Sequence, residues 1–303
     1  MFVFISFLFL HSRLNQEMGL SKLLKIRQWH CLSLIALYCL YSYVYTSRSQ
    51  HYAIALVAIF KNEEQTLSNW ITHHLQQGFD HIFLIDNNSS DRSALIVKLF
   101  EQSGKVSYSY APRQHQQMPH VINLIQRLNL KYKADWIAVC DLDEFFYGTS
   151  KKFSTSLREN FYAFDVVYVP WRMFGSSGLV EHPKDVRLEN TFRRPEIDET
   201  TKYVFRPANV DISKLTIHKV QYPTKWKHLV TTDFDGKYIR MNHYRLQSLE
   251  YFKKVKMIRG DVSFSTSDSI RTMEYFNAWN SNMTAEDTFL KEIVLHPPQN
   301  YYI

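Results

Sequence analysis

Three acidic side chains stand close together at the end of one apolar run, and their spacing suits the binding of a cation. Residues 135–147 read Asp-Trp-Ile-Ala-Val-Cys-Asp-Leu-Asp-Glu-Phe-Phe-Tyr, so Asp141, Asp143 and Glu144 directly follow a buried-strand pattern. Alternate residues of an extended chain point the same way, which brings the carboxylates of Asp141 and Asp143 together. Two anions this close need a shared positive charge, and Mg²⁺ or Mn²⁺ binds a few protein oxygens together with substrate phosphates. The pattern therefore predicts Asp141 and Asp143 as ligands of Mn²⁺ or Mg²⁺.

The elements that must position these acids alternate between strands and helices. Strands are predicted at residues 52–59, 81–86, 106–110 and 136–140, and helices at residues 64–75, through 95–99 and at 121–130. A β-α-β-α order of this kind favours an α/β fold with a mostly parallel central sheet flanked by helices. Ligands of such sheets bind beyond the carboxyl ends of the strands.

Polar residues follow the end of each predicted strand, at the edge where a ligand is expected. Asp86 ends an apolar strand before the turn begins, and an acid there can bind a ribose hydroxyl or a base. Ser89 and Ser90, in contrast, are ordinary turn and helix-capping residues. The candidate nucleotide-binding residues are Lys61, Asn62, Glu63, Asp86, Asn88, Arg113 and Asp141.

Composition excludes several classes of protein. The chain has 303 residues, 45% of them hydrophobic and 15% aromatic, which is enough to bury a full core. Its net charge of +7 is concentrated in residues 1–50, which hold five basic residues and one acid, so the remainder is nearly balanced and no nucleic-acid partner is expected. Cys31 and Cys39 lie in the apolar N-terminal segment, which leaves Cys140 and no disulfide framework for the domain.

The chain divides into an N-terminal hydrophobic and basic segment, residues 1–50, and a catalytic domain, residues 51–303. Residues 29–45 are apolar with flanking Trp and Tyr, but slightly short for a membrane-spanning helix. A single-pass anchor and an interfacial helix both remain open, and the true start is either Met1 or Met18. We expect membrane association, on the cytoplasmic face in a bacterium and in the Golgi lumen in a eukaryote.

Several segments together resemble a known family of enzymes. Residues 57–63, the helix that contains Trp70, residues 84–91 and residues 136–145 are similar to the nucleotide-sugar half of GT-A glycosyltransferases. Residues 169–178, 202–207 and 242–260 resemble glycosyltransferase family 92 and related bacterial family 2-like enzymes. The resemblance covers about residues 52–262. It implies a GT-A fold and inverting transfer of a hexose from a nucleotide sugar, commonly a UDP-hexose, to a glycan or glycolipid, with a bridging divalent metal.

The implied reaction needs a metal, a nucleotide site and a base. Glu181 is favoured as the general base because it follows the Trp171–Gly178 loop, which the resemblance places near the acceptor. Asp185, Asp198 and Glu199 remain candidates for the same role. Many GT-A enzymes bring a late histidine to the metal, which makes His243 a third candidate ligand. A packed core histidine is the alternative for that position.

Other functions remain open at the level of sequence. A metal-dependent phosphotransferase or phosphatase could use the Asp141–Asp143 pair, although Phe145 and Phe146 occupy positions where such enzymes usually carry a hydroxyl residue. A noncatalytic carbohydrate-binding membrane protein would explain the aromatic residues but leaves the acids without a role. A solvated turn would leave the acids in water, and the buried segments on both sides argue against it.

Overall fold

The computed structural model describes residues 50–221, 229–259 and 271–301. The predicted N-terminal hydrophobic helix, its role as a membrane anchor and the choice of start residue fall on residues 1–49 and lie outside the described part. Among the described residues, no helix combines the length and the apolar character needed to cross a membrane.

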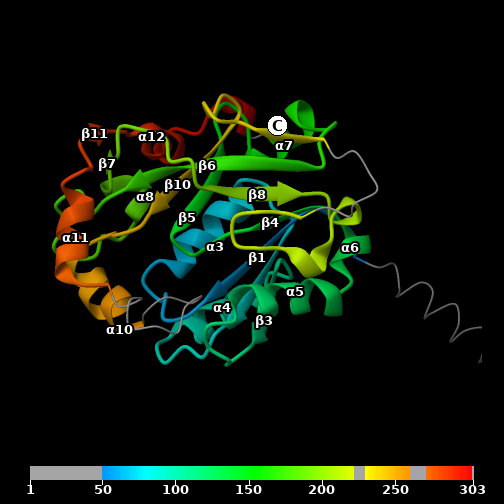
Figure 1. Ribbon diagram of the computed structural model, residues 1–303, viewed down its shortest axis with the longest axis horizontal. Coiled ribbons are helices and arrows are strands. Elements are labelled where there is room, and N and C mark those ends of the chain that lie inside the picture. Colours follow the sequence, from blue (N-terminus) through cyan, green and yellow to red (C-terminus); the bar gives the residue numbers. More distant parts are fainter. Residues whose placement is uncertain (1–49, 222–228, 260–270, 302–303) are drawn as a thin grey trace, which may run out of the picture. The chain divides into compact units, whose positions relative to one another are not determined.

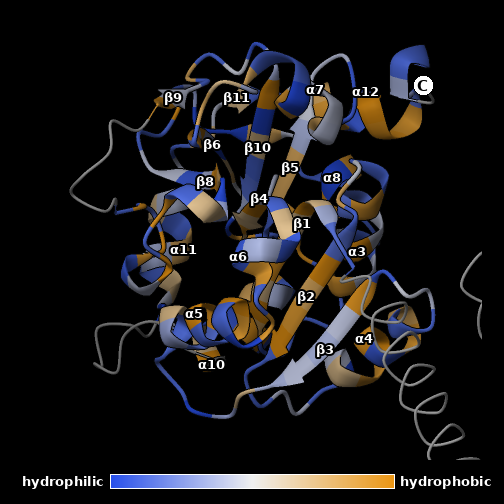
Figure 2. Ribbon diagram, turned by 90° about the vertical axis from the view of Figure 1, so that its right-hand side faces the viewer, coloured by the Kyte–Doolittle hydropathy of each residue, from blue (hydrophilic) through white to orange (hydrophobic). Residues whose placement is uncertain are grey.

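The first half of the domain is the predicted alternation of strands and helices. In chain order it contains β1 (Tyr52–Phe60), α3 (Leu67–Gln76), β2 (His81–Asp86), α4 (Ser93–Glu101), β3 (Val106–Tyr110), α5 (Gln117–Arg127), α6 (Leu130–Lys133) and β4 (Ala134–Val139). Strands β3, β2, β1 and β4 are neighbours in that order, and all three pairings are parallel. Figure 2 shows β2 hydrophobic along its length and β3 paler, as befits a strand at the edge of the sheet. The predicted strands at 81–86 and 106–110 are confirmed to the residue.

The second half adds antiparallel strands, so the sheet as a whole is mixed. Its strands are β5 (Glu144–Gly148), β6 (Val166–Phe174), β7 (Phe192–Arg193), β8 (Thr201–Phe205), β9 (Val230–Thr232), β10 (Ile239–Tyr244) and β11 (Ala285–Glu286). Its helices include α7 (Phe153–Asn160), α8 (Val186–Glu189), α9 (Leu249–Tyr251), the π-helical turn η3 (Phe252–Lys256), α10 (Met257–Arg259), α11 (Met273–Asn280) and α12 (Phe289–Leu295). The described strands form one sheet in the order β11-β7-β6-β8-β4-β1-β2-β3 (Figure 1), with β10, β5 and β9 branching from it. The expectation of a mostly parallel sheet therefore holds for its first four strands, whereas the second half mixes the two directions. Strand β8 pairs antiparallel with both β4 and β6, and β6 pairs parallel with β9 and β10.

The two faces of the parallel strands bury two separate apolar clusters. Alternate residues of β1 point to opposite faces, so Leu56 and Ala58 pack with Trp70 of α3, whereas Val57 packs with Val121 of α5. Each face is covered by the helix that follows one strand and precedes the next, which fixes the register of the sheet. Because β1, β2 and β4 are parallel, their carboxyl ends, which carry the polar loops, lie along the same edge of the sheet.

Strand β5 begins at Glu144 and pairs with only one strand in the described part of the chain, β10. Side chains of α3 form hydrogen bonds with the backbone along the other edge of β5. The indole Nε1 of Trp70 donates to the carbonyl oxygens of Asp141 (3.0 Å) and Glu144 (2.8 Å). One turn further along, His73 Nε2 lies 2.7 Å from the carbonyl oxygen of Phe146. Helix α3 therefore holds the turn that carries the acids by hydrogen bonds as well as by packing.

The hydrogen bonds of Trp70 generate a stability prediction. Trp70→Phe keeps an aromatic ring but removes the donor shared by two carbonyl oxygens, so the free energy of unfolding should fall by about 1–3 kcal/mol. Urea denaturation followed by circular dichroism measures this change. Tyr132→Phe, which alters a ring that is 76% exposed, should change the value by less than about 0.5 kcal/mol. Equal stability of the two variants would show that the indole donor does not hold this turn.

Candidate active site

The acid pair lies in the turn between β4 and β5, beyond the carboxyl end of the parallel strands. The backbone N–H of Glu144 donates to the carbonyl oxygen of Asp141 at 3.1 Å, which closes the turn. Just before it, the N–H of Cys140 donates to the carbonyl oxygen of Val57 in β1 at 3.2 Å. The acids are thus attached directly to the rigid part of the sheet, at the edge where open α/β sheets bind their ligands.

Both carboxylate oxygens of Asp141 are held by side chains from other elements. Gln117, the first residue of α5, donates from Nε2 to Oδ1 at 2.7 Å, and Lys202 on β8 donates from Nζ to Oδ2 at 2.7 Å. Burial opposes ionisation of Asp141, but the charge of Lys202 outweighs it, and the pKa of Asp141 is lowered. The side chain of Asp141 remains 31% exposed, so an outside ligand can still reach it.

Asp143 is more enclosed and is also held by a lysine. Lys256, which is 2% exposed, places Nζ 2.5 Å from Oδ2 of Asp143, and Nε2 of His243 lies 3.5 Å from the same oxygen. Burial alone would raise the pKa of Asp143, but the charge of Lys256 holds it well below the usual range for aspartate. The pKa of His243 is lowered by burial in spite of the neighbouring carboxylate. The site therefore contains an aspartate anion beside an imidazole that favours the neutral form.

Glu144 is a third carboxyl group in the same turn and has no exposed surface. Its Oε2 accepts a hydrogen bond from the backbone N–H of Asp141 at 2.8 Å and lies 3.6 Å from Nζ of Lys202. Its Oε1 has no hydrogen-bond partner among the residues described. Burial raises the pKa of Glu144 to about 8, together with the negative charges of Asp141 and Asp143, although the charge of Lys202 acts in the opposite direction.

The segment α9–η3 connects the acid pair to the end of β1. Ser248 caps α9 by accepting a hydrogen bond from the N–H of Tyr251, and Lys256 ends the π-helical turn η3. The hydroxyl of Tyr251 donates to Oε2 of Glu63 at 2.6 Å, directly after β1. The segment is therefore fixed at two points of the sheet edge, at Glu63 and at Asp143. π-Helical turns are rare and occur frequently at functional sites.

Asp143 and His243 are the residues that fit a divalent ion. Their side chains converge to 3.5 Å, and the buried Nδ1 of His243 has no hydrogen-bond partner in the described part of the chain. Within residues 50–221, 229–259 and 271–301, no group of three or more His, Cys, Asp and Glu side chains is placed to hold a metal. Asp141, the other predicted ligand, accepts hydrogen bonds from Gln117 and Lys202 on its two oxygens, and its role as a direct ligand stays a prediction. Two protein ligands suit Mg²⁺ or Mn²⁺ when phosphate oxygens complete the coordination.

The residues predicted to bind a nucleotide lie on the loops that follow β1, β2 and β3. Asp86 is buried, and it accepts hydrogen bonds from the N–H of Ser89 (2.8 Å) and from the hydroxyl of Tyr108 (2.9 Å). Asn62 has a left-handed backbone with φ of 55° and accepts from the N–H of Ser90 at 2.8 Å. These bonds join the loops after β1 and β2 into one rim.

The remaining members of this predicted set differ in exposure. Asn88 is exposed and accepts a hydrogen bond from the hydroxyl of Tyr110 at 2.8 Å. The side chain of Arg113 is exposed, while its carbonyl oxygen accepts from Nδ2 of Asn87 at 2.9 Å. Lys61 is half-buried beside the buried Glu63. Basic and amide groups thus border the same edge of the sheet as the acids.

The candidate bases differ in how strongly the protein already engages them. Asp185 caps α8 and pairs with Arg187, with Nη2 to Oδ2 at 2.5 Å. Asp198 pairs with Arg194 at 3.2 Å and accepts from the N–H of Thr200 at 2.9 Å. Glu181 and Glu199 are exposed, and neither makes an ion pair with another residue of the described ranges. Two of the four carboxylates are therefore structural in this arrangement, and two are available to accept a proton.

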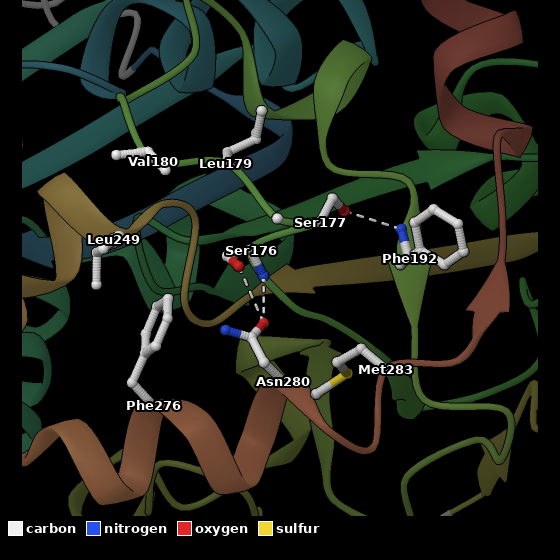
Figure 3. A pocket seen from close by; sticks show the side chains of 10 residues that line it. Ser176, Ser177, Leu179, Val180, Phe192, Leu249, Phe276, Asn280 and Met283 are labelled. Atoms are coloured by element: carbon white, nitrogen blue, oxygen red, sulfur yellow. Dashed lines mark hydrogen bonds between the residues drawn. The ribbon is translucent and has the colours of Figure 1, made fainter.

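A pocket of about 420 Å³ opens beside the segment that precedes Glu181. Its lining, shown in Figure 3, consists of Ser176, Ser177, Gly178, Leu179, Val180, Phe192, Leu249, Phe276, Asn280 and Met283. Asn280 accepts hydrogen bonds from both the N–H and the hydroxyl of Ser176, which ties α11 to the end of β6 (Figure 3). Leu249 begins the α9–η3 segment and donates its N–H to the carbonyl oxygen of Leu179 at 3.0 Å. The pocket and the acid pair therefore border the same short segment.

Sequence reasoning gave no role to Gln117, Lys202 or Lys256, which contact the acids most closely. Lys202 left a signal, because it is a charged residue in the otherwise apolar strand Thr201–Phe205 and is fully buried there. Gln117 and Lys256 gave no such signal in the sequence. A polar residue on a helix is usually exposed, and only the tertiary structure shows that these two contact the acids.

Glu144 makes the stability of the protein depend on pH. Its pKa is about 8 in the folded protein against 4.5 as the ordinary value, so between these pH values only the folded state keeps the proton. The stabilisation is complete below pH 4.5 and is lost as the pH rises through 8. Glu144→Gln cannot ionise, so its melting temperature relative to wild type should rise from pH 5 to pH 8 by at least ~2–4 °C, the shift that corresponds to about 1 kcal/mol.

Calorimetry at several pH values measures this difference. Glu159→Gln, which alters a 48% exposed partner of Lys151, serves as the control and should show a nearly constant difference. A constant difference for Glu144→Gln as well would mean that Glu144 is already ionised in the folded protein at pH 5.

Comparison with known proteins identifies relatives of this chain in one family. A glycosyltransferase family 92 protein of Ricinus communis is 26% identical over 228 residues, which is 70% of this chain and 38% of the relative. One of Arabidopsis thaliana is 27% identical over 206 residues, 63% of this chain and 35% of the relative. The chain thus spans little more than a third of the length of these curated relatives.

Among solved structures, residues 1–349 of S. aureus TarS in complex with UDP-GlcNAc align with a TM-score of 0.42 and 11% identity, over 80% of this chain and 70% of that chain. A mannosyltransferase from Pyrobaculum calidifontis, in complex with GDP-Man and Mn²⁺, aligns with a TM-score of 0.34 and 10% identity, over 66% and 64% of the two chains. These structural similarities are distant. The model of the glycosyltransferase family 92, in contrast, matches residues 52–291, and the chain belongs to this family.

Proposed function

We propose that this chain transfers a hexose from a nucleotide sugar, a UDP-hexose, to a glycan or glycolipid acceptor with inversion at the anomeric carbon. The observation that carries the proposal is the convergence of Asp143, His243 and Lys256 at the carboxyl edge of the sheet, in a chain of glycosyltransferase family 92. Cationic groups and an ion-binding pair at that edge are what a leaving diphosphate requires. The noncatalytic alternative gives these buried groups no role.

The donor binds along the rim formed by the loops after β1, β2 and β4. Asp86 and Asn88 face the nucleoside, and the exposed part of Asp141 accepts a ribose hydroxyl. Gln117 and Lys202 fix the orientation of Asp141 through one bond to each oxygen, so the acceptor atom is preorganised. Lys61 and Arg113 supply positive charge toward the diphosphate.

Asp143 and His243 are the residues that would hold Mn²⁺ or Mg²⁺. When bound, such an ion would supply Lewis-acid stabilisation of the negative charge on the leaving diphosphate. The protein contributes rigidity, because His243 on β10 is paired opposite Glu144 on β5 in an antiparallel ladder. The rings of Trp171 and His243 lie 4.5 Å apart, which limits rotation of the imidazole and excludes water from that side.

The acceptor binds in the pocket that Ser176–Val180 and Phe276 help to line, and Glu181 removes the proton from its hydroxyl. Glu181 directly follows Val180 of the lining, and it makes no ion pair with another described residue. Asp198 is the alternative base, although Arg194 and the N–H of Thr200 already occupy its oxygens. Phe192 and Phe276 offer apolar faces on which a sugar ring can stack.

Asp143→Asn tests the ion-binding role. The substitution keeps the shape of the side chain but removes its charge, so the rate of transfer from UDP-hexose should fall about 10³-fold, as when a main electrostatic stabiliser is lost. The control is Asp135→Asn, which alters a 54% exposed residue of β4, the strand that precedes the acid turn. This variant should retain wild-type activity. The measurement is UDP release in the presence of Mn²⁺ and acceptor, with circular dichroism to verify folding. Near wild-type turnover of Asp143→Asn would refute the assignment of the ion site.

Glu181→Gln tests the general base. Removal of a positioned base should lower kcat by ~10²–10⁴-fold and leave the KM for the donor nearly unchanged, since the donor site is intact. Glu196→Gln is the control, because Glu196 is also exposed but is absent from the pocket lining. If Asp198→Asn loses activity while Glu181→Gln retains it, Asp198 is the base instead.

A further inference from the structure

Each acid of the pair has its own buried lysine. Lys202 has no exposed surface and lies 2.7 Å from Asp141, while Lys256 is 2% exposed and lies 2.5 Å from Asp143. The negative charges of the two acids are therefore balanced within the protein. A divalent ion that entered alone would add two positive charges next to two ammonium groups in a poorly solvated place, which is strongly unfavourable.

Lys256 engages the carboxylate oxygen that the ion would need. Its Nζ lies against Oδ2 of Asp143, the oxygen that also faces Nε2 of His243 at 3.5 Å. An ion held by Asp143 and His243 therefore requires the ammonium group of Lys256 to move away from Oδ2.

The diphosphate of the donor provides the place to which that ammonium group can move. A phosphate oxygen is a strong acceptor for lysine, and the long side chain of lysine rotates without a change of the backbone. Tyr251, whose ring lies 5.7 Å from Nζ of Lys256, is anchored to Glu63, so the backbone of η3 stays fixed while the side chain moves. The negative charge of the diphosphate also offsets the added charge of the ion.

We propose that Lys256 is the resident counter-ion of Asp143 and gives up this carboxylate to the divalent ion only when a nucleoside diphosphate is present to receive its ammonium group. This inference rests on the proposed function. Metal and nucleotide then bind as a unit, each raising the affinity for the other by the same factor. Lys256 contacts the leaving group, whereas Lys202 remains with Asp141 and acts as a positioning residue.

Binding of Mn²⁺ to the purified full-length chain in detergent, with and without UDP, tests the inference by calorimetry and by the electron spin resonance signal of free Mn²⁺. In the wild type, UDP should tighten Mn²⁺ binding about tenfold or more, within the ~5–150-fold range of typical coupling between sites. Lys256→Met should bind Mn²⁺ alone about tenfold more tightly than the wild type and should bind UDP more weakly. The coupling between the two ligands should then nearly vanish.

Lys254→Met is the matched control. Lys254 lies on the same segment but is 69% exposed and pairs with Glu250 at the surface, so its loss should leave both affinities at wild-type values. Lys256→Gln is the second variant in case Lys256→Met is too unstable, because glutamine donates a hydrogen bond to Asp143 without a charge. Mn²⁺ alone should raise the melting temperature of Lys256→Gln and leave that of the wild type nearly unchanged.

The outcomes separate this inference from the proposed function. If the wild type binds Mn²⁺ equally well with and without UDP, or if both Lys256 variants keep wild-type affinities, Lys256 is not the resident counter-ion, and the transferase proposal stands. If the wild type binds UDP but takes up no Mn²⁺ with it, the inference and the ion site fall together. UDP release by wild type and Asp143→Asn reports on the transfer reaction separately.

Discussion

The ion pairs of two buried lysines with the acid pair are the interactions on which the arrangement of this site depends. Asp141 and Asp143 lie within one short turn, and in a poorly solvated environment their mutual repulsion would favour protonation or an open turn. Lys202 and Lys256 keep both acids ionised and fix their positions. A buried ion pair adds little net stability, so its value here lies in holding charge at a defined place, ready for exchange with a charged substrate.

The two lysines come from different parts of the chain and have different freedom. Lys202 is on β8, inside the sheet between β4 and β6, and its side chain has no exposed surface. Lys256 is at the end of the π-helical turn η3, and Leu249 at the start of the same α9–η3 segment lines a pocket of about 420 Å³. A lysine inside the sheet suits the orientation of one carboxylate, and a lysine on a helical turn outside the sheet suits exchange of partners. The site therefore combines a rigid half from the parallel strands with an adaptable half from the C-terminal segment.

Helix α3 connects the stability of the fold to the geometry of the site. Its residues Trp70 and His73 hydrogen-bond to the edge of β5 that faces away from β10, so the strand that starts at Glu144 is held on both sides. These bonds use indole and imidazole groups where another strand would use its backbone. As a result, the acid turn cannot shift without breaking buried hydrogen bonds, which keeps the carboxylates preorganised.

Much of the first half of the domain could be predicted because its signals are local. Short apolar runs identified β1 to β4, and apolar positions at helical spacing identified the helices between them. The strands at His81–Asp86 and Val106–Tyr110 agree to the residue. The strands β7, β9 and β11 are only two or three residues long and carry no period of their own. Their pairing comes from long-range contacts, so the mixed character of the sheet was not predictable.

The sequence by itself determined that Asp141 and Asp143 would follow the end of a buried strand, because the apolar run stops directly before them. The expected extended chain at the acids is instead a closed turn between β4 and β5. It also determined the family resemblance, which the match over residues 52–291 confirms. Only the tertiary structure decided which cations face those acids. Gln117, Lys202 and Lys256 lie 24, 61 and 113 residues from their partners in the sequence. Long-range packing of the chain brings such pairs together, and no local sequence pattern predicts it. The sequence gives the charge of each residue, but the electrostatic role of that residue depends on which opposite charge the fold buries beside it.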